Sequence, residues 1–206
     1  MKLKIGVLGL QGDIEEHIEA TKLALKKLNV EGEVIWTKSG EEVLSVDGLI
    51  IPGGESTVIG LLSTYGRALD AVKEKILEEE FPILGTCAGL IIMAKRAYDK
   101  IVGQTNQELL GAMDITVERN SFGRQKESFE ADLHISVIGE KSFRAVFIRA
   151  PSVKEYGSKV EVIAKLEEYI VGVKERNFLG LAFHPELTND TRVHEYFINL
   201  LQEYKR

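Results

Sequence analysis

The sequence predicts an α/β fold with three layers, in which a central mixed but mostly parallel sheet carries helices on both faces. Up to about residue 95, short apolar runs alternate with stretches of helical periodicity, which is typical of a parallel sheet. Beyond that point, alternating apolar and polar residues indicate half-exposed strands. The chain has 206 residues, 44% hydrophobic and 28% charged, with no repeat or linker, so a single domain over residues 1–206 is expected.

Strands and helices alternate through the first half of the chain. The first strand covers residues 2–10, and the following helix is expected to begin with a capping box made by Asp13 and Glu16. His17 lies beside the apolar stripe of this helix and is interpreted as a packed or partly exposed histidine. The other elements expected here are strands over 33–36 and 47–51, helices through 61–62 and over 68–79, a strand opened by Pro82, and a packed helix over 88–94.

Strands dominate the second half. Residues 113–118 and 131–137 alternate between apolar and polar, so both segments are expected to be half-exposed strands, with His134 on the solvent side. His194, near the end of the chain, is expected at the surface of a helix. The remaining predicted elements are strands over 144–150, 160–165, 169–174 and 178–184, a turn near 176–177, and a helix over 189–204.

Composition limits the classes of partner. A net charge of −6 argues against a nucleic-acid-binding surface, which needs clustered basic residues. The one cysteine cannot form an internal disulfide, and a free thiol suits a reducing compartment. No apolar run is long enough to cross a membrane, and the first apolar run lacks the length and cleavage site of a signal peptide. A cytoplasmic protein without nucleic-acid or membrane partners is therefore expected.

The cysteine lies at the junction of a predicted strand and helix. Gly85, Cys87 and Gly89 form a G-x-C-x-G pattern, the cysteine counterpart of a nucleophile elbow, in which small neighbours let the chain turn sharply. The N-terminus of the following helix favours negative charge, and therefore a reactive thiolate. The alternative is a small cysteine buried in the core, which is common for free cysteines.

A glycine-rich turn follows the strand predicted over 47–51. The adjacent glycines Gly53 and Gly54 permit backbone conformations that bring peptide N–H groups close to a ligand oxygen, so this turn is a candidate oxyanion site. Ser56 or Thr57 can cap the next helix, and a plain strand-to-helix turn is the alternative. The polar loop over 119–125 has enough donors to hold a carboxylate or a partner, and a solvated loop is the alternative there.

His184 and Glu186 lie in the segment FHPEL at the end of the last predicted strand. Pro185 biases His184 toward an extended conformation, in which residues two apart point to the same side. Glu186 is therefore expected to hydrogen-bond His184 and to orient it as the base that activates a cysteine. A metal site that adds His194 and Cys87 to these two ligands is the competing interpretation, although the sequence lacks a paired-ligand spacing such as C-x-x-C.

Six motifs follow one another along essentially the whole chain: GVLGLQGD, LIIPGGEST, GTCAGLI, ERNSFGRQ followed by SFEADL, FIRAP and FHPELT. With these motifs the sequence resembles the class I (triad) glutamine amidotransferases, and among them the glutaminase subunits of pyridoxal 5'-phosphate synthase. The resemblance implies a flavodoxin-like fold and a triad of Cys87, His184 and Glu186. The residues that it implies for the glutamine pocket are Gly54, Glu55, Ser56, Arg119, Ile148 and Arg149.

The resemblance also implies the reaction. L-Glutamine would be hydrolysed to L-glutamate and ammonia through a cysteine thioester, without a cofactor or metal, and a (β/α)8-barrel synthase subunit would take the ammonia to build pyridoxal 5'-phosphate. We expect backbone N–H groups of Gly53, Gly54 and Ala88 to form the oxyanion hole. A cysteine hydrolase with another substrate and a catalytically silent binding subunit are the alternatives.

Overall fold

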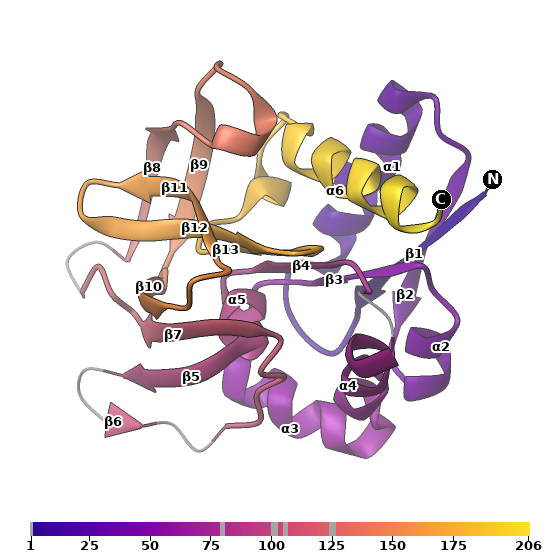
Figure 1. Cartoon of the computed structure of the whole chain (residues 1–206), viewed down its shortest axis with the longest axis horizontal. Coiled ribbons are helices and arrows are strands. Elements are labelled where there is room, and N and C mark those ends of the chain that lie inside the picture. The colour runs from indigo at the N-terminus through magenta and orange to yellow at the C-terminus, as the bar shows by residue number, and fades with distance from the viewer. Residues whose placement is uncertain (1, 79–80, 100–102, 105–106, 124–126) are drawn as a thin grey trace.

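The computed structural model describes residues 2–78, 81–99, 103–104, 107–123 and 127–206 (Figure 1). Its main feature is an eleven-stranded mixed sheet, in which ten strands follow the order β2-β1-β3-β4-β13-β12-β10-β7-β5-β6 and β11 pairs with β12. Two further strands, β8 and β9, form an antiparallel ribbon. Among the described residues, no helix combines the length and the apolar character needed to cross a membrane.

The bounds of the elements are as follows. The helices are α1 (Ile14–Leu28), α2 (Gly40–Leu44), α3 (Ser56–Gly66), α4 (Ala68–Glu78), α5 (Ala88–Met93) and α6 (Arg192–Tyr204), with 3-10 helices η2 (Ser136–Ile138) and η3 (Pro185–Leu187). The strands are β1 (Leu3–Leu8), β2 (Gly32–Thr37), β3 (Gly48–Ile51), β4 (Ile83–Thr86), β5 (Ala94–Asp99), β6 (Gly103–Gln104), β7 (Met113–Arg119), β8 (Ser128–Leu133), β9 (Phe143–Ile148), β10 (Ser152–Tyr156), β11 (Glu161–Leu166), β12 (Tyr169–Glu175) and β13 (Phe178–Leu181).

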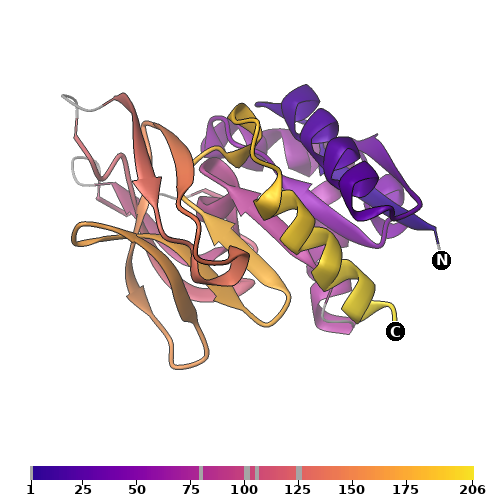
Figure 2. The ribbon, with the colours of Figure 1, turned by 90° about the horizontal axis from the view of Figure 1, so that it is seen from above.

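Helices cover both faces of the parallel half of the sheet. Figure 1 shows α1 and α6 on one face and α2 to α5 on the other, and α1 lies against α6 (Figure 2). Strands β3, β4 and β13 lie between these layers and are buried at every residue. Short continuous apolar runs are what strands covered on both faces require. The predicted three-layer α/β architecture is therefore confirmed.

Parallel pairing brings distant parts of the sequence to one edge of the sheet. Strands β2, β1, β3, β4 and β13 run parallel, and β13 pairs with β4 so that Leu181 lies opposite Thr86. The carboxyl ends of parallel strands meet at the same edge, where ligands of open α/β sheets bind. The turns after β1, β3, β4 and β13 therefore converge there.

An aromatic cluster packs the β8–β9 ribbon against the end of β13. Phe129 stacks on Phe147 with ring centroids 4.7 Å apart, and Phe147 contacts Phe183 with centroids 5.7 Å apart. Phe122 joins the cluster edge-on, 5.2 Å from Phe129. Aromatic pairs at such distances add to the stability gained from burial. Because Phe183 directly precedes His184, this packing fixes the backbone from which the candidate base projects.

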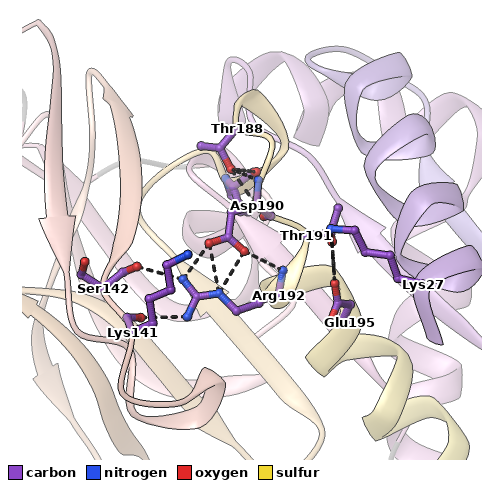
Figure 3. Close-up of polar contacts among 9 residues, drawn as sticks. Lys27, Lys141, Ser142, Thr188, Asp190, Thr191, Arg192 and Glu195 are labelled. Atoms are coloured by element: carbon purple, nitrogen blue, oxygen red, sulfur yellow. Dashed lines mark hydrogen bonds and ion pairs between the residues drawn. The ribbon is translucent and has the colours of Figure 1, made fainter.

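Polar contacts anchor the segment that follows (Figure 3). Asp190 accepts hydrogen bonds from the backbone N–H and the guanidinium of Arg192, at 3.1 and 3.0 Å. Arg192 also donates to the carbonyl oxygens of Lys141 and Ser142, at 2.8 Å each. Charge-assisted hydrogen bonds of this kind are stronger than neutral ones. They tie the start of α6 to the loop before β9.

Several elements were not predicted from the sequence, among them α2, β5, β6 and β10. The helix α2 is only five residues long, although a capping box between Ser39 and Glu42 marks its start. Strand β5 begins at Ala94, where the preceding apolar run was expected to finish its helix. Strand β10 has three exposed residues in a row and hence no alternation. The strand expected over 131–137 lies earlier in the chain, since β8 covers Ser128–Leu133 and the 3-10 helix η2 begins at Ser136.

Two of the three polar residues over 113–118 in β7 are buried, contrary to the half-exposed strand expected, whereas Asp114 is exposed. Thr116 is 7% and Glu118 is 4% exposed. The reason is that β7 lies inside the sheet between β10 and β5, whose long side chains cover these two residues. Arg96 donates to the Thr116 hydroxyl at 3.0 Å, and Tyr98 donates to the Glu118 carboxylate at 3.1 Å. By contrast, His134 is exposed, as expected.

Both proposed helix caps are wrong. Asp13 occupies the N-cap position of α1 but makes no side-chain capping bond, because its carboxylate reaches another partner described below. Glu55 occupies the N-cap position of α3, also without a side-chain cap. Ser56 is the first residue of that helix, and its hydroxyl donates to Gln107 at 3.0 Å. Tertiary contacts have therefore replaced local capping at both helix starts.

Candidate active site

Cys87 lies in a strained turn between β4 and α5, with φ 49° and ψ −101°. Positive φ is uncommon for a residue with a Cβ atom, and such strain clusters at functional sites. The flanking glycines permit the turn: a Cβ at Gly85 would lie 2.4 Å from the sulfur of Met93. A Cβ at Gly89 would lie 2.0 Å from the carbonyl oxygen of Ile51. The turn has the geometry expected of a nucleophile elbow.

The Cys87 side chain lines a cavity of about 460 Å³ and is 8% exposed. Its Sγ lies 3.7 Å from the carbonyl oxygen of Ile148, and its backbone N–H donates to Leu181 at 2.8 Å. A cysteine of the apolar core would be enclosed by hydrocarbon, whereas this one borders a cavity lined with charged and polar groups. The geometry therefore favours the reactive interpretation of Cys87 over the core interpretation.

His184 enters the same cavity from the end of β13. Its backbone N–H donates to Val146 of β9 at 2.8 Å, which attaches it to the ribbon. Its Nδ1 lies 2.7 Å from Oε1 of Glu186, so the expected hydrogen bond is present. The local conformation differs from the expected one, because Glu186 lies in the 3-10 helix Pro185–Leu187 and not in an extended segment. The tight turn brings the two side chains together.

A second carboxylate reaches the same ring nitrogen. Oδ2 of Asp13 lies 3.1 Å from Nδ1 of His184. This role was missed because Asp13 was assigned to a helix cap. A signal was available, since Asp13 follows β1 and parallel strands deliver the residues after them to the site edge. Two carboxylates therefore share one imidazole N–H.

The protonation of His184 follows from these neighbours. Burial lowers the pKa of His184, but hydrogen bonds with Asp13, Cys87 and Glu186 outweigh burial and raise it to about 12. Burial raises the pKa of Glu186 and His184 opposes that rise, whereas the hydrogen bond to His184 lowers the pKa of Asp13. His184 is therefore an imidazolium at neutral pH. Its Nε2 is buried and makes no aligned hydrogen bond within the described residues, so the N–H of this nitrogen is left for the neighbouring Cys87 side chain.

The structure gathers the predicted glutamine-pocket residues around the cavity. The lining includes Cys87, His184, Gly54, Glu55, Ser56, Arg119, Ile148 and Arg149. Each of the remaining predicted residues adjoins a lining residue: Gly53 precedes Gly54, Ala88 follows Cys87, and Glu186 bonds His184. Asn120 of the polar loop predicted over 119–125 also lines the cavity, and the lining residues that sequence reasoning missed are Gln11, Asp13, Ile91, Glu127 and Ser128.

The glycine turn after β3 packs against the turn after β1. Gly54 has φ +140° and Gly12 has φ +109°, conformations that favour glycine. A Cβ at Gly12 would lie 1.7 Å from the carbonyl oxygen of Gly53, and a Cβ at Gly53 would lie 2.3 Å from the ring of His184. Gln11 accepts a hydrogen bond from the backbone N–H of Glu55 at 2.9 Å. The Gly53–Gly54 turn therefore packs so closely against His184 that no side chain fits at Gly53.

Arg119 is a half-buried cation of the cavity. Its side chain is 17% exposed, and Nη2 donates to Oε1 of Glu55 at 2.7 Å. Both residues line the cavity, so the pair offers it a cation and an anion. Arg149, also at the cavity, has φ 45°, and its backbone N–H donates to Glu127 at 2.7 Å. Residues 124 and 125 of the polar loop lie outside the described residues.

The two other histidines of interest are buried, not exposed. His17 is 0% exposed, in keeping with the packed interpretation, but His194 is also 0% exposed and the surface expectation is wrong. The cause is that α6 turns this residue toward α1, where the two imidazoles meet. The expected alternative metal site is not assembled as proposed: the metal-sized cluster within the described residues joins Asp13 to His184 and Glu186, without Cys87 or His194. Both of its carboxylates share the Nδ1 proton.

The chain is similar to known proteins over nearly its whole length. The profile of the SNO glutamine amidotransferase family matches residues 7–203. A relative from Nitrosopumilus maritimus is 46% identical over 206 residues, all of both chains, and one from Pyrococcus furiosus is 51% identical over 198 residues, covering 95% of this chain and 98% of the relative. Both are named pyridoxal 5'-phosphate synthase subunit PdxT. A glutamine amidotransferase crystal structure superimposes with a TM-score of 0.82 at 44% identity, covering 96% of this chain and 98% of the other.

Proposed function

The chain belongs to the SNO glutamine amidotransferase family, and we propose that Cys87, His184 and Glu186 form the catalytic triad with which it hydrolyses L-glutamine to L-glutamate and ammonia. The observation that carries the proposal is the cavity itself. It is bordered by a cysteine in a strained elbow and by an imidazole whose other nitrogen is held by a carboxylate. This is the arrangement that activates a cysteine nucleophile.

The thiolate of Cys87 attacks the side-chain amide carbon of glutamine. The oxyanion that forms is stabilised by backbone N–H groups of the Gly53–Gly54 turn and of Ala88 at the start of α5. When the tetrahedral intermediate collapses, the C–N bond breaks and His184 gives its Nε2 proton to the departing ammonia. The product of this half-reaction is a γ-glutamyl thioester on the enzyme.

Water completes the cycle. The neutral imidazole of His184 takes a proton from the attacking water, the thioester C–S bond breaks, and glutamate leaves with the thiolate and imidazolium restored. Glu186 and Asp13 both accept a hydrogen bond from Nδ1–H of His184 and stabilise the positive charge of the ring. The two carboxylates keep Nε2 directed at the reacting atoms throughout both half-reactions.

We propose that the Arg119–Glu55 pair binds the amino-acid end of the substrate. The guanidinium of Arg119 suits the α-carboxylate, because its fork of donors matches two oxygens. The carboxylate of Glu55 suits the α-ammonium group. Gly54, Ser56, Ile148 and Arg149 complete the wall around the rest of the molecule. Glutamine then spans the cavity with its amide at the elbow.

Relatives spanning the whole chain carry the name of a pyridoxal 5'-phosphate synthase subunit, and the chain is a glutaminase that supplies ammonia to such a synthase. We propose that residues 1–206 act as a single domain in the cytoplasm, docked on a (β/α)8-barrel subunit that consumes the ammonia. Ammonia released into neutral water becomes mostly protonated and non-nucleophilic, so direct transfer makes chemical sense. We expect the free subunit to be poorly active until docking orders the glycine turn.

The test is to mix the chain with its synthase partner and measure glutamate release and glutamine-dependent cofactor formation. The wild type should be active in the mixture and weakly active alone, and Cys87→Ala should be inactive in both. Full activity of the free subunit would refute the docking requirement. Hydrolysis of other amides or peptides in preference to glutamine would favour a different cysteine hydrolase.

A labelling experiment separates an enzyme from a silent binding subunit. A diazoketone analogue of glutamine should alkylate the wild-type chain once, and mass spectrometry should locate the adduct on Cys87. The Cys87→Ala variant should remain unlabelled. A wild-type chain that binds glutamine but forms no adduct would contradict the proposed nucleophile.

A further inference from the structure

Two buried histidines lie directly behind the proposed triad. His17 on α1 and His194 on α6 are both 0% exposed, and Nδ1 of His17 lies 3.2 Å from Nε2 of His194. On its other side, Nε2 of His17 lies 3.0 Å from Oγ1 of Thr86 and 3.2 Å from Oε2 of Glu186. A continuous line of polar groups therefore runs from α6 through α1 to the triad carboxylate.

The Glu186 carboxylate needs this neighbour. Its Oε1 is held by His184 at 2.7 Å, but Oε2 receives no aligned hydrogen bond from the described residues. A buried carboxylate oxygen without a donor is costly, because no water compensates its charge. The Nε2–H of His17, shared between the Thr86 hydroxyl and Oε2 of Glu186, supplies the partial positive charge that this oxygen otherwise lacks. The contact also reaches the nucleophile, since Thr86 directly precedes Cys87.

The positions of the atoms select one tautomer for each ring. Because a carboxylate only accepts, Nε2 of His17 must carry its hydrogen and Nδ1 must be bare. Nδ1 can then accept from Nε2–H of His194, which leaves Nδ1 of His194 bare. That nitrogen has no hydrogen-bond partner within the described residues. The opposite tautomers would bury an N–H without an acceptor and would aim a lone pair of His17 at the carboxylate.

We infer that His17 and His194 are positioning residues of the glutaminase site, a pair of neutral Nε2–H imidazoles that orient Glu186 behind His184. The inference rests on the triad assigned under the proposed function. Neither ring touches the cavity, so both act through Glu186. Two histidines that only filled space between helices would not need an N–H group directed at the Glu186 carboxylate.

Neutrality of the pair is part of the arrangement. Burial, aided by electrostatic interaction with the imidazoles of His194 and His184, holds the pKa of His17 well below its usual value, and burial lowers the pKa of His194 to about 4. A second imidazolium beside Glu186 would compete with His184 for the carboxylate. A neutral donor steadies Glu186 without removing the charge that His184 requires. The groups that face His17 are thus Glu186, Thr86 and His194, with His184 beyond the carboxylate.

The tautomers can be measured directly in the full chain. The protein has four histidines, so ¹⁵N-labelled imidazoles give few signals, and each is assigned by its loss in a single His→Gln variant. His17 and His194 should both show a protonated Nε2 and a bare Nδ1, unchanged between about pH 6 and 8. A protonated Nδ1 on His17, or an imidazolium at either position in this range, would overturn the inference.

Kinetics of the complex with its synthase supply the second test. His17→Leu should lower kcat for glutamine hydrolysis by about tenfold or more while KM changes less than about twofold, because a donor to a charged group is lost away from the substrate. His17→Gln, whose amide can donate from a similar position, should recover most of kcat. The matched control is His134→Leu, which removes an exposed imidazole and should leave kcat unchanged.

The two tests separate this inference from the proposed triad. A folded His17→Leu variant with wild-type kcat would refute the positioning role and leave the glutaminase assignment intact. Equal losses of kcat in His17→Leu and His17→Gln would also refute it, because packing alone would then explain the effect. Failure of wild-type Cys87 to react with the glutamine analogue would refute the triad, whatever tautomers the histidines adopt.

Discussion

Folding stability should depend on pH through the buried imidazole of His194. Burial lowers the pKa of this group to about 4, whereas an unfolded chain has the ordinary value of 6.5. Between these values the unfolded chain binds a proton that the folded chain excludes. The contribution of the neutral His194 ring to folding stability is therefore fully present above about pH 6.5 and is lost as the pH falls toward 4. Replacing the ring in His194→Leu should remove this part of the pH dependence.

The magnitude follows from the difference in pKa. At pH 4.5 the unfolded ring lies two pH units below its pKa, and each unit corresponds to about 1.4 kcal/mol, so His194 should account for about 2 to 3 kcal/mol of stability lost relative to pH 7.5. That is a large share of a typical unfolding free energy of about 5 to 15 kcal/mol. Urea unfolding followed by circular dichroism at the two pH values measures it for the wild type and the variant.

The quantity to compare is the change in unfolding free energy between pH 7.5 and pH 4.5, because His194→Leu also alters packing and absolute stability. His17 remains in the variant, so some pH dependence should persist. The control His134→Leu removes an exposed imidazole and should keep the wild-type dependence. If wild type and His194→Leu lose the same stability between pH 7.5 and 4.5, the ring is not held neutral by burial and the reasoning is wrong.

Further predictions concern the turns and the substrate cation. Gly12→Ala should abolish glutamate release, because the added Cβ would lie 1.7 Å from the carbonyl oxygen of Gly53. Gly139 also has positive φ, but a Cβ there meets nothing within 4 Å, so Gly139→Ala should cost less stability in thermal unfolding. Arg119→Lys should raise KM for glutamine about tenfold with little change in kcat, because the fork is lost; steady-state kinetics measures both. Cys87→Gly should be more stable than Cys87→Ala by about 1 kcal/mol, since glycine relieves the strained turn; equal stability would argue against strain.

The parallel half of the fold could be predicted because its signals are local. Short apolar runs between glycine-rich turns identify strands such as β3 and β4, and helical periodicity identifies α1 and α6. The predicted exposure of strand residues was wrong where a neighbouring strand decides burial. Thr116 and Glu118 are examples, because long side chains of the adjacent strand β5 cover them. Local alternation cannot reveal whether a strand lies inside a sheet or at its edge.

The candidate site divides in the same way. The elbow at Cys87 and the His184–Glu186 contact depend on residues close together in the sequence, so their patterns predicted them. Asp13 was assigned to a cap and His194 to the surface, because their actual partners lie in other elements. A polar residue at a helix start or on a helix face has a local explanation in the sequence. Only the three-dimensional structure shows that Asp13 contacts His184 and that His194 contacts His17.

The topology explains why so many charged groups can be tolerated in one small volume. Parallel strands β1, β3, β4 and β13 each deliver one turn to the same edge, so Asp13, Cys87 and His184 meet although their backbones belong to separate, independently supported elements. The negative charges of Asp13 and Glu186 would repel each other if left alone, and the imidazolium between them removes that cost. A positive His184 is thus required by its surroundings before any substrate arrives, which prepares its Nε2 proton for the leaving ammonia. The strain at Cys87 and the charge on His184 are both maintained by the rest of the fold and are both available to the reaction.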